Sequence, residues 1–154
     1  MFVVSGSVGR TAGWNDESAP LLSASELVDL REAGIFIGSH SRSHRRLSWL
    51  AQEEIRHEVG GSREDLEQLL GAPVRFFCYP NYDLDARVLA AVSEANYARA
   101  AGGRSGALRR YNLHRIDAWR MTTRQLALHV LGFHHWARRQ PLPQTVSRLA
   151  ARLA

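Results

Sequence analysis

The chain has 154 residues, 45% of them hydrophobic and 23% charged, values typical of one globular domain with a packed core. It has no apolar run of about 18 residues, so we expect no membrane span. It also shows no export signal at its start, so the default expectation is a cytoplasmic location. The formal net charge is +5, but the 20 basic residues, all Arg, are scattered and not interleaved with aromatic residues. Nucleic acid is therefore not an expected partner.

Strand and helix signals alternate from the start of the chain, which predicts an α/β protein with parallel strands. The apolar residues 2–5 predict a short buried strand, and the turn-forming residues 9–20 predict a loop. Ser23 and Glu26 have the spacing of a capping box and predict the start of a helix. Gly34 is predicted to end that helix in a left-handed conformation.

Residues 35–39 predict the next strand, which leads directly into His40. A long helix should follow, because apolar and small residues recur at steps of three or four, namely Ile55, Val59, Ser62, Leu66 and Leu69. Gly71 and Pro73 should end it. Residues 74–79 predict a third strand, which contains the single cysteine, Cys78. We expect that thiol to be buried.

Asp83 is the predicted cap of a third helix, whose apolar face comprises Val88, Leu89 and Val92. Asn96 stands where a left-handed residue is needed at the helix end. A strand is then predicted at 97–101, a loop at 102–110 and a fifth strand at 113–118. A helix should follow over 123–131. The final residues, 144–154, have the pattern of a basic amphipathic helix or a tail.

The strongest chemical signal is the segment Gly38-Ser39-His40-Ser41-Arg42-Ser43-His44. His40 follows a predicted strand, and active sites of α/β folds gather at the carboxyl ends of strands. Two neutral imidazoles four residues apart can bind one zinc ion at about 2.0–2.1 Å. The three serines are suited to hydrogen bonds that orient the rings. The alternative is a polar turn with two solvated histidines, because this spacing also arises by chance.

Several segments together resemble the NodB-homology polysaccharide deacetylases (carbohydrate esterase family 4). They are Phe2-Val3-Val4-Ser5-Gly6, Trp14-Asn15-Asp16, Leu22-Ser23, the two-histidine segment, Phe76-Phe77-Cys78-Tyr79-Pro80-Asn81 and the helix from Asp83 to Tyr97. The resemblance implies a distorted (β/α) barrel. It assigns residues 1–132 to a partial deacetylase domain and leaves 133–154 as a basic helix or tail.

The resemblance also implies an activity, namely metal-dependent hydrolysis of acetyl groups from a polysaccharide or amino-sugar polymer. His40 and His44 would be two ligands of an Asp-His-His site for a divalent metal, with zinc as the expected ion. That metal would polarise the acetyl carbonyl and activate water. By the same resemblance, Tyr79, Pro80 and Asn81 would contact substrate and provide a backbone N–H for the oxyanion.

A later motif of the family is matched less closely. Asp117 would support catalysis and Trp119 would contact substrate, the alternative being a strand-end aspartate and a core tryptophan. His114 is the expected general acid because it lies near a strand, whereas His129 lies in a predicted helix and is the weaker alternative. Two further histidines, His134 and His135, are expected to be solvated.

The chain departs from the family at its first motif, a strand that ends in two adjacent aspartates. That motif precedes the segment matched by residues 2–4, and no adjacent pair of aspartates occurs in this chain. We therefore expect a fold that lacks its first strand, together with the base and the third metal ligand. Asp16 is the nearest acidic candidate for that ligand. The third motif also differs, because Cys78-Tyr79-Pro80-Asn81 stands where many members have Arg-x-Pro-Tyr.

Two other functions stay open at this point. The chain could be a non-catalytic remnant of the fold that binds glycan or metal without turnover. It could instead be a basic module for anionic polymers, whose affinity would fall steeply with salt and would not respond to metal.

Overall fold

The computed structural model describes residues 1–12, 19–103, 110–115 and 121–130. The chain forms two compact units, Met1–Arg115 and Ile116–Ala154. Within the described ranges, no helix has both the length and the apolar character needed to cross a bilayer.

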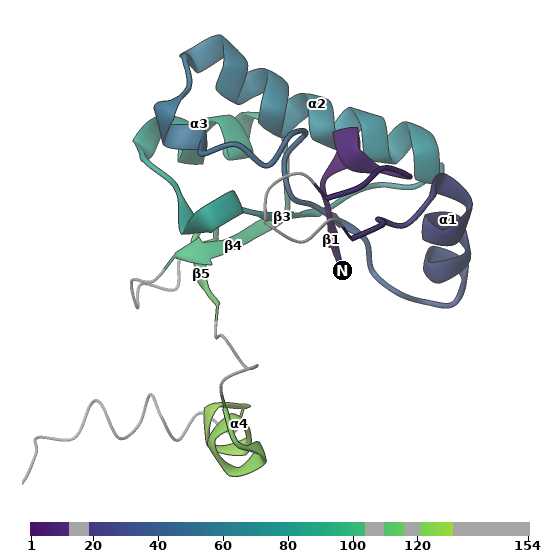
Figure 1. Ribbon diagram of the computed structural model, residues 1–154. Helices are drawn as coiled ribbons and strands as arrows, with labels where there is room; N and C mark the ends of the chain where they lie inside the picture. Colours follow the sequence, from purple (N-terminus) through teal and green to yellow (C-terminus); the bar gives the residue numbers. More distant parts are fainter. Residues whose placement is uncertain (13–18, 104–109, 116–120, 131–154) are drawn as a thin grey trace, which may run out of the picture. The chain divides into compact units, whose positions relative to one another are not determined.

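The first unit is built on a parallel sheet with strands in chain order, β1-β2-β3-β4-β5. The strands are β1 (Phe2–Val3), β2 (Gly38–Ser39), β3 (Phe76–Cys78), β4 (Arg99–Gly103) and β5 (Leu113–His114). The connecting helices are α1 (Ala24–Glu32), α2 (Gln52–Leu70) and α3 (Ala86–Glu94). Figure 1 shows α2 and α3 side by side over one face of this sheet. The predicted α/β class with parallel strands is thus confirmed.

The helix boundaries follow from local sequence signals. At the start of α1 the Ser23 hydroxyl accepts the N–H of Glu26, and the Glu26 carboxylate accepts the N–H of Ser23 at 2.8 Å, so the predicted capping box is present. Gly34, Gly71 and Asn96 all lie near the helix ends where they were predicted, and all three have positive φ angles.

The core lies between the helices and the sheet. The face predicted for α2 is buried there, including Ile55, Val59 and Leu66, all fully inaccessible to solvent. A polar link crosses this core: the hydroxyl oxygens of Ser39 and Ser62 lie 2.7 Å apart. This link ties the end of β2 to the middle of α2.

The third helix begins two residues later than predicted. Its cap is Asp85, whose carboxylate accepts the N–H of Val88 at 2.9 Å. The Asp83 carboxylate instead accepts the backbone N–H and the hydroxyl of Ser48, both at 2.8 Å. The prediction for Asp83 is therefore wrong, because a 3-10 turn at Pro80–Tyr82 precedes the helix and Asp83 connects that turn to the short helix Leu47–Trp49.

Strand bounds also differ from the predictions. The strand predicted at 35–39 is shorter, with Phe36 outside the sheet and 80% exposed. Gly102, predicted in a loop, lies in β4, where a Cβ atom would come within 2.5 Å of the Tyr79 ring. Of the strand predicted over 113–118, Leu113 and His114 form β5 and Arg115 lies after it. Residues 116–118 and 144–154 lie outside the described residues.

The second unit contains α4 (Thr123–Val130), close to the helix predicted over 123–131. The Thr122 hydroxyl accepts the N–H of Gln125, whose side-chain oxygen accepts the N–H of Thr122 at 2.8 Å. These two bonds fix the first turn of α4.

Candidate metal centre

His40 lies directly after β2, at the carboxyl end of the sheet. Its backbone N–H donates to the carbonyl of Val3 at 2.8 Å, and its ring Nδ1 lies 2.6 Å from the carbonyl oxygen of Cys78. A carbonyl oxygen only accepts, so Nδ1 carries the proton in this bond. The bond to the Cys78 carbonyl therefore fixes the tautomer of His40 and leaves the lone pair of Nε2 for a ligand.

The ring of His44 lies beside that of His40. The two ring centroids are 4.9 Å apart and the ring planes meet at 73°. This separation is short enough for both rings to bind one ion at about 2.0–2.1 Å from each ligating nitrogen. The structure thus brings together the two histidines that the sequence predicts as ligands.

Both imidazoles are held in their neutral form. Burial lowers the pKa of His40 to about 4, against the opposing effect of its bond to Cys78, and repulsion from a protonated His44 and from Arg115 lowers it further. Burial and the Arg115 charge also lower the pKa of His44. Neutral imidazole is the form that binds metal, so the pair is ready to ligate at neutral pH.

The loop between the histidines has an unusual backbone. Ser41 and His44 have φ angles of 66° and 60°, in the left-handed region. For residues other than Gly this region costs of order 1–3 kcal/mol each, and such costs concentrate at functional sites. The buried Ser41 hydroxyl accepts the N–H of His44 at 3.0 Å, which offsets part of that cost.

A buried carboxylate from α2 binds Arg42 and Ser43, the two residues between Ser41 and His44. Glu58 is only 5% exposed, and one of its oxygens accepts the N–H groups of Arg42 and Ser43 at 3.0 and 2.9 Å. Its other oxygen accepts the hydroxyl of Ser43. The loop therefore satisfies this carboxylate with three donors.

The side chain of Arg42 makes a second attachment to α2. Its guanidinium donates to both oxygens of Asp65, at 2.7 and 2.5 Å, and the Ser5 hydroxyl donates to the same carboxylate at 2.8 Å. A Cβ atom at Gly61 would come within 2.9 Å of this guanidinium. The missing side chain at Gly61 makes room for the pair.

Arg115 is a site residue that sequence reasoning missed. It follows β5, and its guanidinium donates to the Cys78 thiol at 2.5 Å and lies 4.0 Å from the centroid of the Tyr82 ring. Its charge reaches both histidines, as their lowered pKa values indicate. The strand predicted over 113–118 includes it, whereas β5 ends at His114 and so leaves Arg115 at the carboxyl end of the sheet.

The three residues predicted to contact substrate differ in exposure. Tyr79 is fully buried, its hydroxyl donates to the carbonyl of Tyr111 at 2.7 Å, and burial raises its pKa. Pro80 is buried as well, so these two side chains pack in the core. Asn81 is exposed and has a φ of 54°. Asn81 is therefore the member of the trio whose side chain solvent can reach.

The remaining predicted site residues are placed as follows. His114 lies in β5 with its side chain exposed, and Cys78 is 1% exposed, as expected for the lone thiol. His129 lies in α4, in the second unit. The others lie outside the described residues: Asp16, Asp117, Trp119, His134 and His135.

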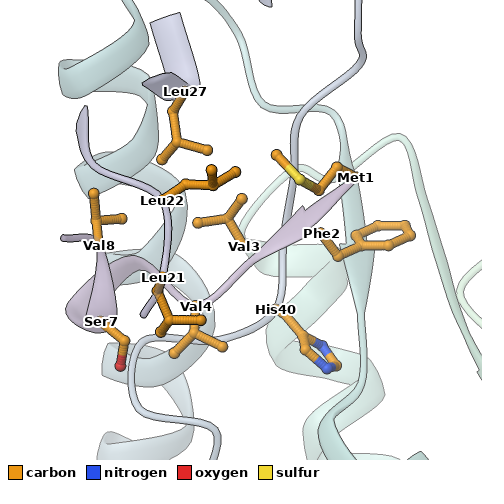
Figure 2. Close-up of a pocket in the computed structure, with 10 residues that line it drawn as sticks. All are labelled: Met1, Phe2, Val3, Val4, Ser7, Val8, Leu21, Leu22, Leu27 and His40. Atoms are coloured by element: carbon orange, nitrogen blue, oxygen red, sulfur yellow. The ribbon is translucent and has the colours of Figure 1, made fainter. Parts of the chain in front are cut away.

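An apolar pocket lies beside β1 and reaches His40 (Figure 2). Its volume is about 150 Å³, and aliphatic side chains such as Val4, Leu22 and Leu27 provide most of its lining. Among the residues that line the pocket, His40 is the one whose side chain carries ring nitrogen atoms. Figure 2 shows the His40 ring apart from the aliphatic side chains. The pocket offers an apolar surface next to one of the two histidines.

The residues present fit a metal in donor type. Two neutral imidazoles are ordinary zinc ligands. Among the residues that the structure describes, no group of three or more His, Cys, Asp or Glu side chains is arranged to hold an ion. The described part of the chain therefore offers two ligands, His40 and His44.

Comparison with known families identifies the chain. The sequence profile of the polysaccharide deacetylase family matches residues 1–100, well over half of the chain. The chain belongs to the polysaccharide deacetylase family, and the expectation drawn from its motifs is confirmed. The comparison with curated protein sequences gives no match.

Solved structures share the fold. A polysaccharide deacetylase from Bacillus cereus superposes with a TM-score of 0.63 at 26% identity, over 70% of this chain and 36% of its own. A Streptococcus pyogenes deacetylase in complex with acetate gives 0.60 at 20% identity, over 64% and 46%. A de-N-acetylase from Aggregatibacter actinomycetemcomitans gives 0.64 at 12% identity, over 82% and 62%. The chain thus spans less than two thirds of the length of each.

Proposed function

We propose that the chain is the histidine-bearing part of a carbohydrate deacetylase. The enzyme would use a divalent metal, with zinc as the expected ion, to hydrolyse acetyl groups on a polysaccharide or amino-sugar polymer. Membership of the polysaccharide deacetylase family supports the substrate class. The bound acetate named for the streptococcal structure supports acetate as the product.

One observation carries the metal dependence: two neutral imidazoles, His40 and His44, meet with centroids 4.9 Å apart at the carboxyl end of a parallel sheet. When bound there, the metal supplies Lewis acidity toward the acetyl carbonyl. The bond from His40 to the Cys78 carbonyl keeps the metal-binding nitrogen unprotonated.

Two other residues suit the negative charge that develops on the acetyl oxygen. The guanidinium of Arg115 provides a fixed positive charge beside the histidines. The backbone N–H of Asn81 is the oxyanion donor that we assign in the Tyr79–Asn81 segment. The N–H of Tyr79 already donates to the Ala101 carbonyl at 3.1 Å, and Pro80 has none.

Zinc calorimetry on the wild-type chain and three single variants tests the metal site. We expect stoichiometric binding that is lost in His40→Ala and in His44→Ala. His114→Ala, a matched histidine on β5, should bind as wild type does. Equal binding by all four proteins, or none by the wild type, would contradict the proposed site.

Acetyl release from chitin oligosaccharides and from acetylated peptidoglycan fragments tests the reaction. We expect zinc-dependent release that is abolished by the same two histidine variants. Zinc binding without release would favour a module that binds glycan or metal without turnover. Binding of an anionic polymer that weakens with salt and does not depend on zinc would favour the alternative of a basic module for anionic polymers.

A further inference from the structure

We infer that Glu58 is a positioning residue that holds the loop 41–44 in the conformation that brings His44 to His40. The inference rests on the proposed function, because it concerns the same pair of ligands. It is carried by a juxtaposition: one buried carboxylate binds the two residues that lie between two left-handed residues.

The loop needs an external support. Ser41 and His44 both have positive φ angles. Two of the four loop residues therefore adopt a backbone conformation that is disfavoured for residues with side chains. The bond from the His44 N–H to the Ser41 hydroxyl closes the turn from within. It leaves the N–H groups of Arg42 and Ser43 to be satisfied from elsewhere.

Glu58 satisfies both groups from a fixed position. It lies on α2 between Ile55 and Val59, which are fully buried, so the backbone that carries it is held by the core. Its carboxylate is itself buried and would be costly to leave without donors. The arrangement is mutual: the carboxylate receives its donors only when the loop adopts this conformation, and the loop receives its acceptor only from α2.

The attachment of Arg42 to Asp65 makes the inference testable. This ion pair joins the same loop to α2 independently, at 2.5 Å. We therefore expect the loop to stay near α2 when Glu58 is replaced, while the amides of Arg42 and Ser43 lose their acceptor and His44 loses its fixed position. The protein should remain folded, because the core residues around Glu58 are unchanged.

Three variants separate positioning from general stability. Glu58→Ala removes the acceptor. Glu58→Gln keeps one oxygen that can accept both N–H groups, although the bonds lose their charge assistance. Glu53→Ala, on the same helix with a side chain 86% exposed, is the matched control. Hydrogen exchange of the Arg42 and Ser43 amides is measured by NMR on metal-free protein, and zinc affinity by calorimetry.

We expect Glu58→Ala to accelerate exchange at these two amides selectively and to weaken zinc binding by about 10–100-fold, the usual effect of removing a residue that orients a metal ligand. Glu58→Gln should lie between Glu58→Ala and wild type in both measurements, and Glu53→Ala should match wild type. Unchanged exchange and unchanged zinc affinity in Glu58→Ala would overturn the inference.

The outcome for the proposed function is separate. A wild-type chain that binds no zinc would remove the proposed function, yet the exchange measurement would still decide whether Glu58 holds the loop. Should Glu58→Ala fail to fold, Glu58→Gln decides: selective exchange at the two amides supports positioning, and wild-type exchange with wild-type zinc affinity overturns it.

Discussion

The ring Nδ1 of His40 lies 2.6 Å from the carbonyl oxygen of Cys78, the last residue of the neighbouring strand β3. The acceptor is a backbone atom, so its position depends on the pairing of β2 with β3 and not on the identity of the side chain at 78. The orientation of a candidate metal ligand is thus built into the sheet itself.

Acid should destabilise the metal-free protein through His40. Its pKa is about 4 in the folded chain and near 6.5 when unfolded, so the unfolded state binds more protons between these values. The free energy of unfolding is therefore highest above pH 6.5 and falls as the pH falls toward and below about 4. The contribution of His40 to this loss is about 3 kcal/mol. Urea unfolding at a series of pH values measures the loss. His40→Gln should flatten the curve in this window, and an unchanged slope would contradict the assignment.

Arg115 should control the pKa of His44. Its charge contributes to the lowering of that pKa, after burial. Arg115→Ala should therefore raise the His44 pKa toward its ordinary value, and Arg115→Lys should leave it closer to wild type because the charge is kept. An NMR titration of the His44 ring protons gives both values. Identical midpoints in wild type and Arg115→Ala would show that the charge does not reach the ring.

Two adjacent glycines of α2 should respond oppositely to alanine. A Cβ atom at Gly60 meets nothing within 4 Å, so Gly60→Ala should stabilise the helix by about 0.5–1 kcal/mol. A Cβ atom at Gly61 would lie 2.9 Å from the Arg42 guanidinium and displace it from Asp65. We expect Gly61→Ala to give no such stabilisation and to weaken zinc binding. Thermal unfolding and calorimetry on both variants provide the comparison, and equal effects would count against a fixed position of Arg42.

The two aspartates before α3 should have different roles in solution. Asp85→Ala should cost about 1 kcal/mol through loss of the helix cap, and Asp85→Asn should recover most of it. Asp83→Ala removes the acceptor of the Ser48 N–H and hydroxyl, so amide exchange at Ser48 should accelerate in that variant alone. Denaturant unfolding and NMR exchange distinguish them. Faster exchange at Ser48 in Asp85→Ala would reverse the assignment.

The sequence predicted what local patterns encode. The capping box at Ser23 and the left-handed ends at Gly34 and Asn96 each depend on a few adjacent residues, and all are present. The prediction of Asp83 as the helix cap was wrong, and Asp85, two residues later, has the same capping side chain. Only the distant Ser48 decides between them.

The site was predictable in part for the same reason. The histidine pair is a short motif, and its two rings do meet. Glu58 adjoins the predicted apolar face of α2 but looks like any acidic helix residue until the loop is placed against it. Arg115 follows β5 and binds the Cys78 thiol, and from there its charge acts on both histidines. Spacing along the chain does not reveal such a relationship between distant segments.

Glu58 and Asp65 stand seven residues apart on α2, which is close to two full helical turns. Both carboxylates therefore point toward the same side of the helix, one to the backbone of the loop and the other to its arginine. A single residue inserted between them would rotate Asp65 by about 100° around the helix axis and away from the loop. The number of residues in this helical segment is thus constrained in addition to their identity, because an insertion or deletion between the two acids breaks their alignment even when every side chain is kept.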